Sequence, residues 1–214
     1  MARWVPLRHN EGMRHAPDPY YRHRFPAEII RSAVWLYHTF SLSFRDVELL
    51  LAERGITVSY ETVRRWCRKF AQTFANWLRR RRSKPGDRWH LDEVFIKING
   101  VQHYLWRAVD QSGVVLDVLV QSRRNAQAAQ RFFRKLLKGE RFAPRVIVTD
   151  QLKSYGAAKR FKSPRQAQQF LSAHGLIRQI FHPGRHHLSA AEYRTYRAEA
   201  FEAWAEITSA RTAA

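Results

Sequence analysis

The chain lacks several features that would each indicate a particular class of protein. Its 214 residues include a single cysteine, Cys67, which excludes a disulfide framework and a cysteine-based zinc site. No apolar run approaches the roughly 18 residues of a membrane span. Residues 1–25 also lack the apolar stretch of a signal peptide. We therefore expect a protein of the reducing cytoplasm.

Acidic residues are scarce as well. Asp and Glu number 18 against 38 Lys and Arg, which gives a net charge of +20 at pH 7 and a pI near 11.1. Such a field favours polyanions, and nucleic acid is the first candidate because binding releases the counterions condensed on its phosphates. An anionic membrane is the weaker alternative, since no segment pairs a strong apolar face with a basic one. A soluble basic protein without such a partner is the plain alternative.

The first 84 residues divide into a basic arm and a helical segment. Residues 1–25 are rich in Arg, His and Pro and show no periodicity, so we interpret them as a flexible arm. From residue 26 to residue 84 the pattern predicts three helices. The first follows Pro26, and its apolar stripe is Ile29, Ala33, Leu36 and Phe40.

The second and third helices have recognisable beginnings. Ser43 and Asp46 have the spacing of a capping box, and Gly55 ends the helix that they open. Ser59 can cap the third helix, whose apolar residues recur at helical spacing as far as Trp77. Three short helices with a glycine-containing turn before the last are typical of a helix-turn-helix domain.

The third helix has a polar and basic face that suits DNA. Six side chains are expected to point outward: Tyr60, Thr62, Arg64, Arg65, Arg68 and Lys69. Arginine on such a helix can pair with guanine edges in the major groove. Arg80 and Arg81 belong to an unbroken basic run and are candidates for phosphate contacts. The alternative is an ordinary helical bundle with a solvated basic face.

After Pro85-Gly86 the periodicity changes from helical to strand-like. Three strands are predicted at 89–98, 102–109 and 114–120, with Asn99-Gly100 as a hairpin turn. A helix at 126–138 and a short buried strand at 145–149 follow. Residues 87–160 therefore have an RNase H-like layout, which makes the chain an α+β or α/β protein with a helix-turn-helix domain in front.

Two aspartates lie where a sheet enzyme would hold a metal ion. Asp92 interrupts an apolar strand, where a charge is costly without a partner or a task. Asp150 ends the 145–149 strand, and the carboxyl ends of strands are where sites in α/β sheets gather. If the two strands are neighbours, both carboxylates can meet one divalent cation such as Mg²⁺. The alternative for each is an ordinary helix cap or turn residue.

Several segments together resemble one protein family. These are 88–100 (RWHLDEVFIKING), 104–110 (YLWRAVD), 148–156 (VTDQLKSYG) and, upstream, Tyr37, 43–48 (SFRDVE) and 59–66. They resemble the DDE transposases of the insertion-sequence-six family of bacteria, over most of the chain from about Phe25 onward. The resemblance implies that Asp92 and Asp150 are the first two catalytic and metal-binding acids. It also implies recognition of terminal inverted repeats, Mg²⁺-dependent strand transfer into target DNA, and a homo-oligomer.

The chain departs from that family at the third acid. Where the family has a glutamate, this sequence has Arg185, and no acidic residue occurs between Asp150 and Glu192. The sequence up to Arg160 continues directly into a sequence that, in the family, lies beyond the glutamate. We interpret this as an in-frame internal deletion joined near Lys159-Arg160, which leaves the RNase H-like domain incomplete.

The last 54 residues offer two weaker candidates for chemistry. Residues 161–214 are expected to form a helical tail, with helices at 164–173 and 192–207. Glu192 could replace the missing acid, but the matching position in the family is not catalytic. His182, His186 and His187 could suggest a metal site, but Pro183-Gly184 between them and the arginines around them favour a solvated basic loop. The sequence thus predicts a DNA-binding transposase relative with defective catalysis; the alternative is a non-enzymatic regulator or dominant-negative subunit, and a third possibility is an active enzyme that uses another acid.

Overall fold

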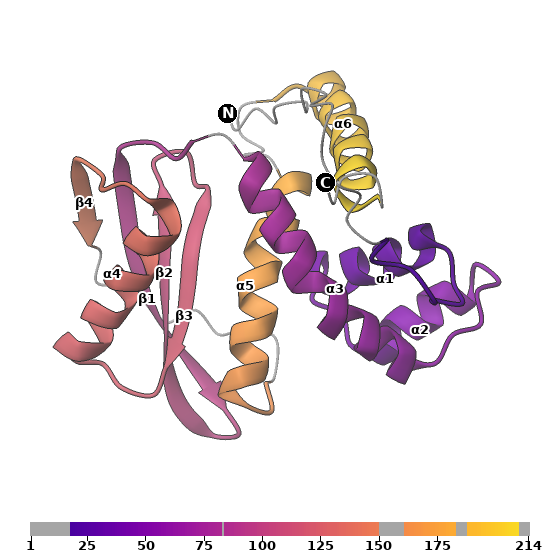
Figure 1. The fold of residues 1–214 in the computed structure, drawn as a ribbon, viewed down its shortest axis with the longest axis horizontal. Helices are drawn as coiled ribbons and strands as arrows, with labels where there is room; N and C mark the ends of the chain where they lie inside the picture. The colour runs from indigo at the N-terminus through magenta and orange to yellow at the C-terminus, as the bar shows by residue number, and fades with distance from the viewer. Residues whose placement is uncertain (1–17, 83, 150–160, 183–187, 210–214) are drawn as a thin grey trace. The chain divides into compact units, whose positions relative to one another are not determined.

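The computed structural model describes residues 18–82, 84–149, 161–182 and 188–209, and these form two compact units. The helical unit contains 18–82, 176–182 and 188–209, and the sheet unit contains 84–149 and 161–175. In chain order the elements are α1 (Ala27–Thr39), α2 (Phe44–Ala52), α3 (Tyr60–Arg81), β1 (Arg88–Ile98), β2 (Val101–Asp110), β3 (Val115–Gln121), α4 (Ala126–Glu140), β4 (Val146–Thr149), α5 (Pro164–Phe181) and α6 (Ala190–Thr208) (Figure 1). None of the described helices is both long and apolar enough to cross a membrane.

The helical unit has the three helices predicted before residue 84, with the predicted caps. The Ser43 side chain accepts from the backbone N–H of Asp46 at 3.1 Å, and the Asp46 carboxylate accepts from the backbone N–H of Ser43 at 2.8 Å. Gly55 follows α2 with a φ of +74°, a conformation that costs glycine little. Ser59 caps α3 through the N–H of Thr62. Local hydrogen bonding therefore sets the ends of α2 and α3.

The buried face of α1 differs from the predicted one. Ile30, Ala33, Val34 and Tyr37 are buried, whereas Phe40 of the predicted stripe is 52% exposed. The face is rotated by about one residue, because it is selected by contacts with α2, α3 and α6 rather than by the periodicity of α1 alone.

The end of the chain completes the helical unit. Trp204 of α6 is buried and packs edge-to-face on Phe74 of α3, with 5.4 Å between ring centroids. Arg31 of α1 donates to the Ala205 carbonyl at 2.9 Å. Tyr20 is also buried, stacks on Phe70 and donates to the Thr208 carbonyl. Residues 18–25 are thus attached to the unit through Tyr20, and α6 matches the helix predicted at 192–207.

The sheet unit has a mixed four-stranded sheet in the order β3-β2-β1-β4. β1, β2 and β3 pair antiparallel, and β1 pairs parallel with β4. Asn99 and Gly100 form the predicted hairpin turn, with φ of +50° and +78°. Because this turn has only two residues, Ile98 pairs with Val101 and the register of the whole hairpin follows from it.

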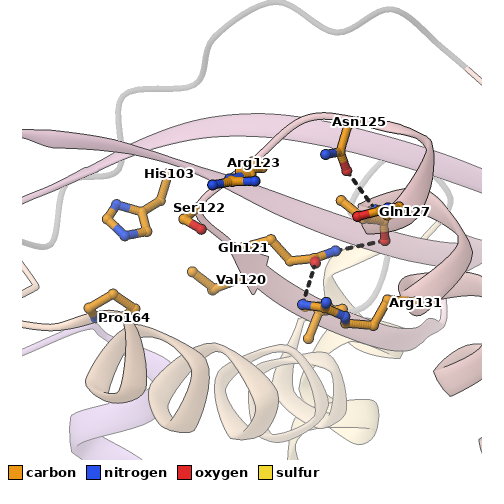
Figure 2. A pocket seen from close by; sticks show the side chains of 11 residues that line it. His103, Val120, Gln121, Ser122, Arg123, Asn125, Gln127, Arg131 and Pro164 are labelled. Carbon is orange, nitrogen blue, oxygen red and sulfur yellow. Dashed lines mark hydrogen bonds between the residues drawn. The ribbon is translucent and has the colours of Figure 1, made fainter.

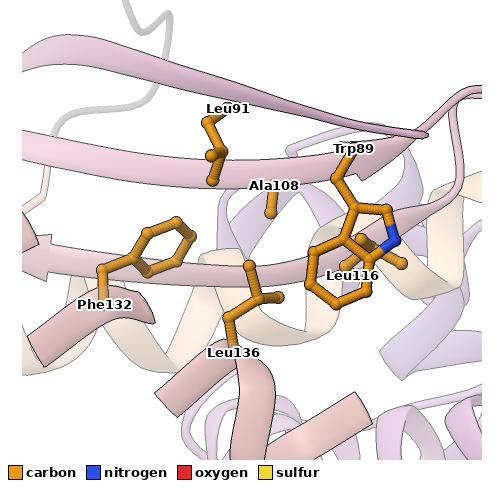
Figure 3. Packing of buried hydrophobic residues seen from close by; sticks show 6 residues of the cluster. All are labelled: Trp89, Leu91, Ala108, Leu116, Phe132 and Leu136. Carbon is orange, nitrogen blue, oxygen red and sulfur yellow. The ribbon is translucent and has the colours of Figure 1, made fainter. Parts of the chain in front are cut away.

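One face of the sheet is covered by α4, as Figure 3 shows. Phe132 and Leu136 of α4 pack on Trp89, Leu91, Ala108 and Leu116, and all six are buried. Burial of a large apolar side chain is worth about 1.5–3 kcal/mol. This cluster therefore fixes β1, β2 and β3 on α4, and it decides which residues of β1 face away from the core.

β4 lacks comparable cover. The sequence predicts a buried strand here, but Val146 and Ile147 are each 43% exposed and Val148 is 37% exposed. The prediction of burial is therefore wrong, although the strand itself is present.

α5 extends further than predicted, to Phe181 instead of residue 173. Gly175, a residue that weakens helices, lies inside it because a Cβ at this position would come within 3.3 Å of the Val115 methyl groups. Near the start of α5, the Gln168 amide bonds to β3: it accepts from the Val120 N–H at 2.7 Å and donates to the Val118 carbonyl at 3.0 Å. These two bonds satisfy the outer edge of β3, as a further strand would.

Candidate active site and nucleic-acid interface

Asp92 lies in the middle of β1, on the face of the sheet opposite α4. Its neighbour Leu91 is in the α4 core, and successive strand residues point to opposite faces. The Asp92 side chain is 15% exposed, and its Oδ2 accepts from the guanidinium of Arg107 through Nε, at 3.2 Å, and through Nη2. A half-buried carboxylate is thus balanced by one cation.

Arg107 is a site residue that the sequence reasoning did not identify. It lies directly opposite Asp92 in the β1–β2 register. A signal for it existed, since the two-residue turn at Asn99-Gly100 makes the pairing of every residue in the hairpin calculable from the sequence. Arg107 therefore explains how β1 tolerates the charge of Asp92. The sequence indicated that this charge needs either a partner or a functional role, and Arg107 is such a partner.

The parallel pairing of β1 with β4 leads to the second predicted acid. The last described pair in this register is Leu91 with Thr149. In the sequence, Leu91 is followed by Asp92 and Thr149 by Asp150. Asp150 itself lies outside the described residues, so its predicted role is untested.

The other acids near Asp92 have structural partners. Glu93 points to the α4 side of the sheet, and its Oε2 accepts from Arg124 Nε at 2.8 Å. Asp117 is 7% exposed and pairs with Lys135 at 2.6 Å. Asp110 is a turn residue and accepts from the backbone N–H groups of Ser112 and Val114.

Glu192 is engaged elsewhere. It lies at the beginning of α6 in the helical unit, where its carboxylate accepts from the Ser189 backbone N–H at 2.7 Å in a capping box. This backbone hydrogen bond, with a further bond to the Ser189 side chain, lowers the pKa of Glu192. Of the three histidines considered, His182 is exposed, while His186 and His187 lie outside the described residues.

The donor set can be compared with the magnesium ions that the resemblance implies. Mg²⁺ demands near-octahedral oxygen coordination. One carboxylate oxygen of Asp92 is engaged by Arg107, and among the described residues no three Asp, Glu, His or Cys side chains are grouped as a metal site would require. The described residues alone therefore do not fit a two-metal centre.

The predicted DNA-binding residues of α3 form one polar surface. Arg64, Arg65, Arg68 and Lys69 are exposed, while Tyr60 and Thr62 are half-buried at the beginning of the helix. Arg64 pairs with Glu61 at 2.7 Å, Arg65 donates to the Thr62 hydroxyl at 3.1 Å, and Lys69 lies 2.8 Å from a ring nitrogen of His23. The Arg45 guanidinium covers the Tyr60 ring at 4.6 Å. These contacts are short-range and exposed, so the guanidinium groups can exchange them for a ligand.

Arg80 and Arg81, at the end of α3, differ from each other. Arg80 is exposed. The Arg81 side chain is only 10% exposed and pairs with Glu206 of α6 at 3.2 Å. Arg80 therefore offers the more accessible guanidinium, whereas Arg81 also links α3 to α6.

Comparison with known proteins defines the class of this site. Residues 86–169 match a family model described as a DDE domain, and this span includes both Asp92 and Asp150. The sheet unit is therefore a DDE domain in its sequence, and a mixed four-stranded sheet with Asp92 on its first strand is compatible with that class.

The similar proteins identify the family more closely. The transposase for insertion sequence-like element IS431mec of Staphylococcus aureus strain N315 is 35% identical over 136 residues, which cover 63% of this chain and 60% of that protein. The transposase for insertion sequence element IS257 in transposon Tn4003 of Staphylococcus aureus is 34% identical over the same length. The protein pYV0051 of Yersinia pseudotuberculosis is 40% identical over 73 residues, or 33% of this chain and 67% of that protein.

The chain is therefore similar, through its DDE domain and over 63% of its length, to insertion-sequence transposases, and this similarity supports the insertion-sequence-six family that its motifs predict. Members of this family are enzymes, and they generally use a divalent metal ion. The matched region spans 60% of the length of the transposases named above.

Proposed function

We propose that this chain is a DNA-binding protein of transposase lineage that has lost strand-transfer activity. In this proposal residues 26–84 bind the terminal inverted repeats, 87–160 are an incomplete RNase H-like catalytic domain, and 161–214 are a helical tail after the deletion. The observation that carries the proposal is the DDE-domain match, which spans Asp92 and Asp150, on a chain with no acid between Asp150 and Glu192.

DNA binding is supported by α2 and α3. Arg64, Arg65 and Arg68 lie on the exposed face of a helix whose other face is buried, and Tyr60 and Thr62 lie at its beginning. This is the arrangement in which a helix-turn-helix presents its second helix to the major groove. Lys69, Arg80 and, less accessibly, Arg81 supply further positive charge for phosphates.

The catalytic proposal concerns Asp92 and Asp150. The β1–β4 register supports their pairing, because it runs to the residue before each aspartate. Two carboxylates near Arg107 would hold one Mg²⁺ weakly, since adjacent positive charge opposes cation binding. A second ion, which the two-metal mechanism needs, would lack its ligand. Glu192 does not replace the missing third acid in this proposal, because its hydrogen bonds in the capping box of α6 already account for this residue.

A regulatory role is the second candidate. A protein that keeps the DNA-binding unit without catalysis would occupy the inverted repeats, or would join active subunits in mixed, inactive oligomers. Its partners would be double-stranded DNA and copies of the same fold, in the cytoplasm at the bacterial nucleoid. The intact packing of the helical unit favours this candidate, because Trp204 and Arg81 join α6 to α3.

The test separates binding from regulation. The full chain is titrated with a duplex carrying the ends of its element and with a scrambled duplex, and tighter binding of the true ends is expected. The chain is then added to a strand-transfer reaction of an active relative, where the regulator predicts inhibition. The control is a variant of the chain in which three arginines of the exposed α3 face are replaced (Arg64→Ala, Arg65→Ala, Arg68→Ala). Equal affinity for both duplexes would contradict specific end recognition.

A further inference from the structure

A cavity of about 580 Å³ lies in the sheet unit at the beginning of α4 (Figure 2). Its walls come from the end of β3, the loop after it, the first turns of α4, His103 of β2 and Pro164 of α5. The cavity size is typical of a ligand site rather than of a packing defect. Among the described residues, none of the DNA-binding or catalytic candidates lines it.

The charge of this cavity has one sign. Arg123 and Arg131 line it together with His103, and no carboxylate is among the lining residues that the structure describes. Arg123 differs from its neighbour Arg124, which is paired with the half-buried Glu93. Among the described residues, no acid pairs with Arg123 or Arg131, so both cations are available to an anion.

The polar groups of the cavity are held in place by the fold. Gln121 is 8% exposed, donates to the Ala128 carbonyl at 2.8 Å and accepts from Arg131. His103 is also 8% exposed, and its Nδ1 lies 3.1 Å from the Val101 carbonyl. A carbonyl only accepts, so Nδ1 carries the proton. The other ring nitrogen, Nε2, has no hydrogen-bond partner within the part of the chain that the structure describes.

The surroundings indicate a polymer of phosphates rather than a single small anion. Arg134 and Lys138 follow Arg131 at helical spacing on the exposed face of α4, with no acidic partner among the described residues. From Arg131 to Lys138 the helix rises by about 10 Å, because each of the seven steps adds about 1.5 Å. Glu140 is the only acid between Ser122 and Arg141 in the sequence. A row of cations that starts at a cavity fits an extended nucleic-acid backbone.

We propose that the Arg123–Arg131 cavity binds backbone phosphates of a DNA duplex, as a contact site on the sheet unit separate from α3. The proposal rests on the proposed function in one respect, namely that the chain binds DNA. It adds a second surface, so that the sheet unit contributes affinity without reading sequence. Arg123 and Arg131 would contact phosphate oxygens, and Gln121 would position Arg131.

The test uses the full chain and a short duplex of random sequence. The Arg123→Gln/Arg131→Gln variant is compared with Arg88→Gln/Arg145→Gln, which removes the same charge from exposed positions of the same unit outside the cavity. Each lost phosphate contact lowers the slope of log affinity against log salt by about 0.9. The cavity variant should therefore lose nearly two units of slope and bind at least about tenfold more weakly at low salt. The single Arg123→Gln variant should lose about one unit, and it removes no hydrogen bond between side chains or backbone groups of the described residues.

The outcomes are distinguishable from those of the proposed function. Equal slopes for the cavity variant and the Arg88/Arg145 control would overturn the cavity proposal, because only net charge would then matter. If Arg64→Ala/Arg65→Ala/Arg68→Ala still weakens binding in that case, the helix-turn-helix proposal stands alone. A parent chain that binds no duplex would overturn both. Circular dichroism of Arg123→Gln, expected to match the parent chain, separates lost contacts from lost folding.

Discussion

The helical unit and the sheet unit differ in how completely they are covered. In the helical unit, α6 closes over α1 and α3, and Trp204, Ile207 and Ala200 are all buried. In the sheet unit, β1 to β3 are covered by α4, but the side chains of β4 are exposed. Segments that lie at opposite ends of the sequence thus complete one unit, while the other lacks cover at the strand that leads to Asp150.

This difference in coverage bears separately on DNA recognition and on catalysis. DNA recognition needs a stable helix with an exposed basic face, and α3 has both a buried stripe and that face. Catalysis needs acids from distant segments at one place, and this requirement fails when a single segment is missing. A deletion can therefore remove strand transfer while leaving DNA binding.

The largest expected effect is recovery of catalysis. Insertion of the family's missing segment between Arg160 and Phe161 should raise strand transfer by orders of magnitude, because it restores both the third acid and the helix that presents it. Products are measured on gels with labelled element ends. In the restored chain, Asp92→Asn or Asp150→Asn should abolish activity again, whereas Glu192→Gln should leave it unchanged. Insertion without recovery would contradict the deletion hypothesis.

The second prediction concerns the completeness of the helical unit. Trp204→Ala should lower its free energy of unfolding by about 3–5 kcal/mol, because a buried indole that packs on Phe74 is removed. Denaturant titration followed by circular dichroism measures this change. Glu199→Ala, at an exposed position of α6, is the matched control and should shift the free energy by less than about 0.5 kcal/mol. A small effect of Trp204→Ala would mean that α6 is dispensable to the unit.

The third prediction distinguishes base readout from phosphate contact on α3. If Arg64 or Arg65 reads a base, its change to Ala should cost about 1–3 kcal/mol for the true ends and relax specificity. Arg80→Ala should weaken all duplexes alike and lower the salt slope by about 1. Arg81→Ala should affect unfolding more than binding, since Arg81 pairs with Glu206. Unchanged affinity after Arg64, Arg65 and Arg68 all become Ala would refute the helix-turn-helix assignment.

The smallest expected effect is on β4. Ile147→Thr should change the free energy of unfolding by no more than about 0.5 kcal/mol, because Ile147 is 43% exposed, and it should improve solubility. Leu91→Ala on the adjacent strand should cost about 2–5 kcal/mol. Thermal melts and the saturation concentration of the protein report both effects. Similar costs for the two changes would show that β4 is covered in solution.

The features that the sequence predicted well depend on local chemistry. The capping box at Ser43 and Asp46, the cap at Ser59 and the turn at Asn99-Gly100 each need only neighbouring residues, and all are present. The antiparallel register, and with it the position of Arg107 opposite Asp92, follows from that turn and was open to prediction.

The features that the sequence missed depend on distant segments. The buried face of α1 is set partly by α6, so Ile30 is buried where Ile29 was expected. Val146 to Val148 have the composition of a buried strand, yet burial requires a covering element that periodicity cannot supply. The motif resemblance, by contrast, identified the family because it compares whole segments.

The most direct test of the central claim measures binding and strand transfer in one preparation. The chain is incubated with its element's ends, target DNA and Mg²⁺, beside an active full-length relative and a Glu192→Gln variant of the chain itself. The predicted result is saturable binding of the ends with no strand-transfer product above background, for both the chain and its Glu192→Gln variant. Robust strand transfer by the chain that is lost in the Glu192→Gln variant would contradict the claim and identify Glu192 as the third catalytic acid.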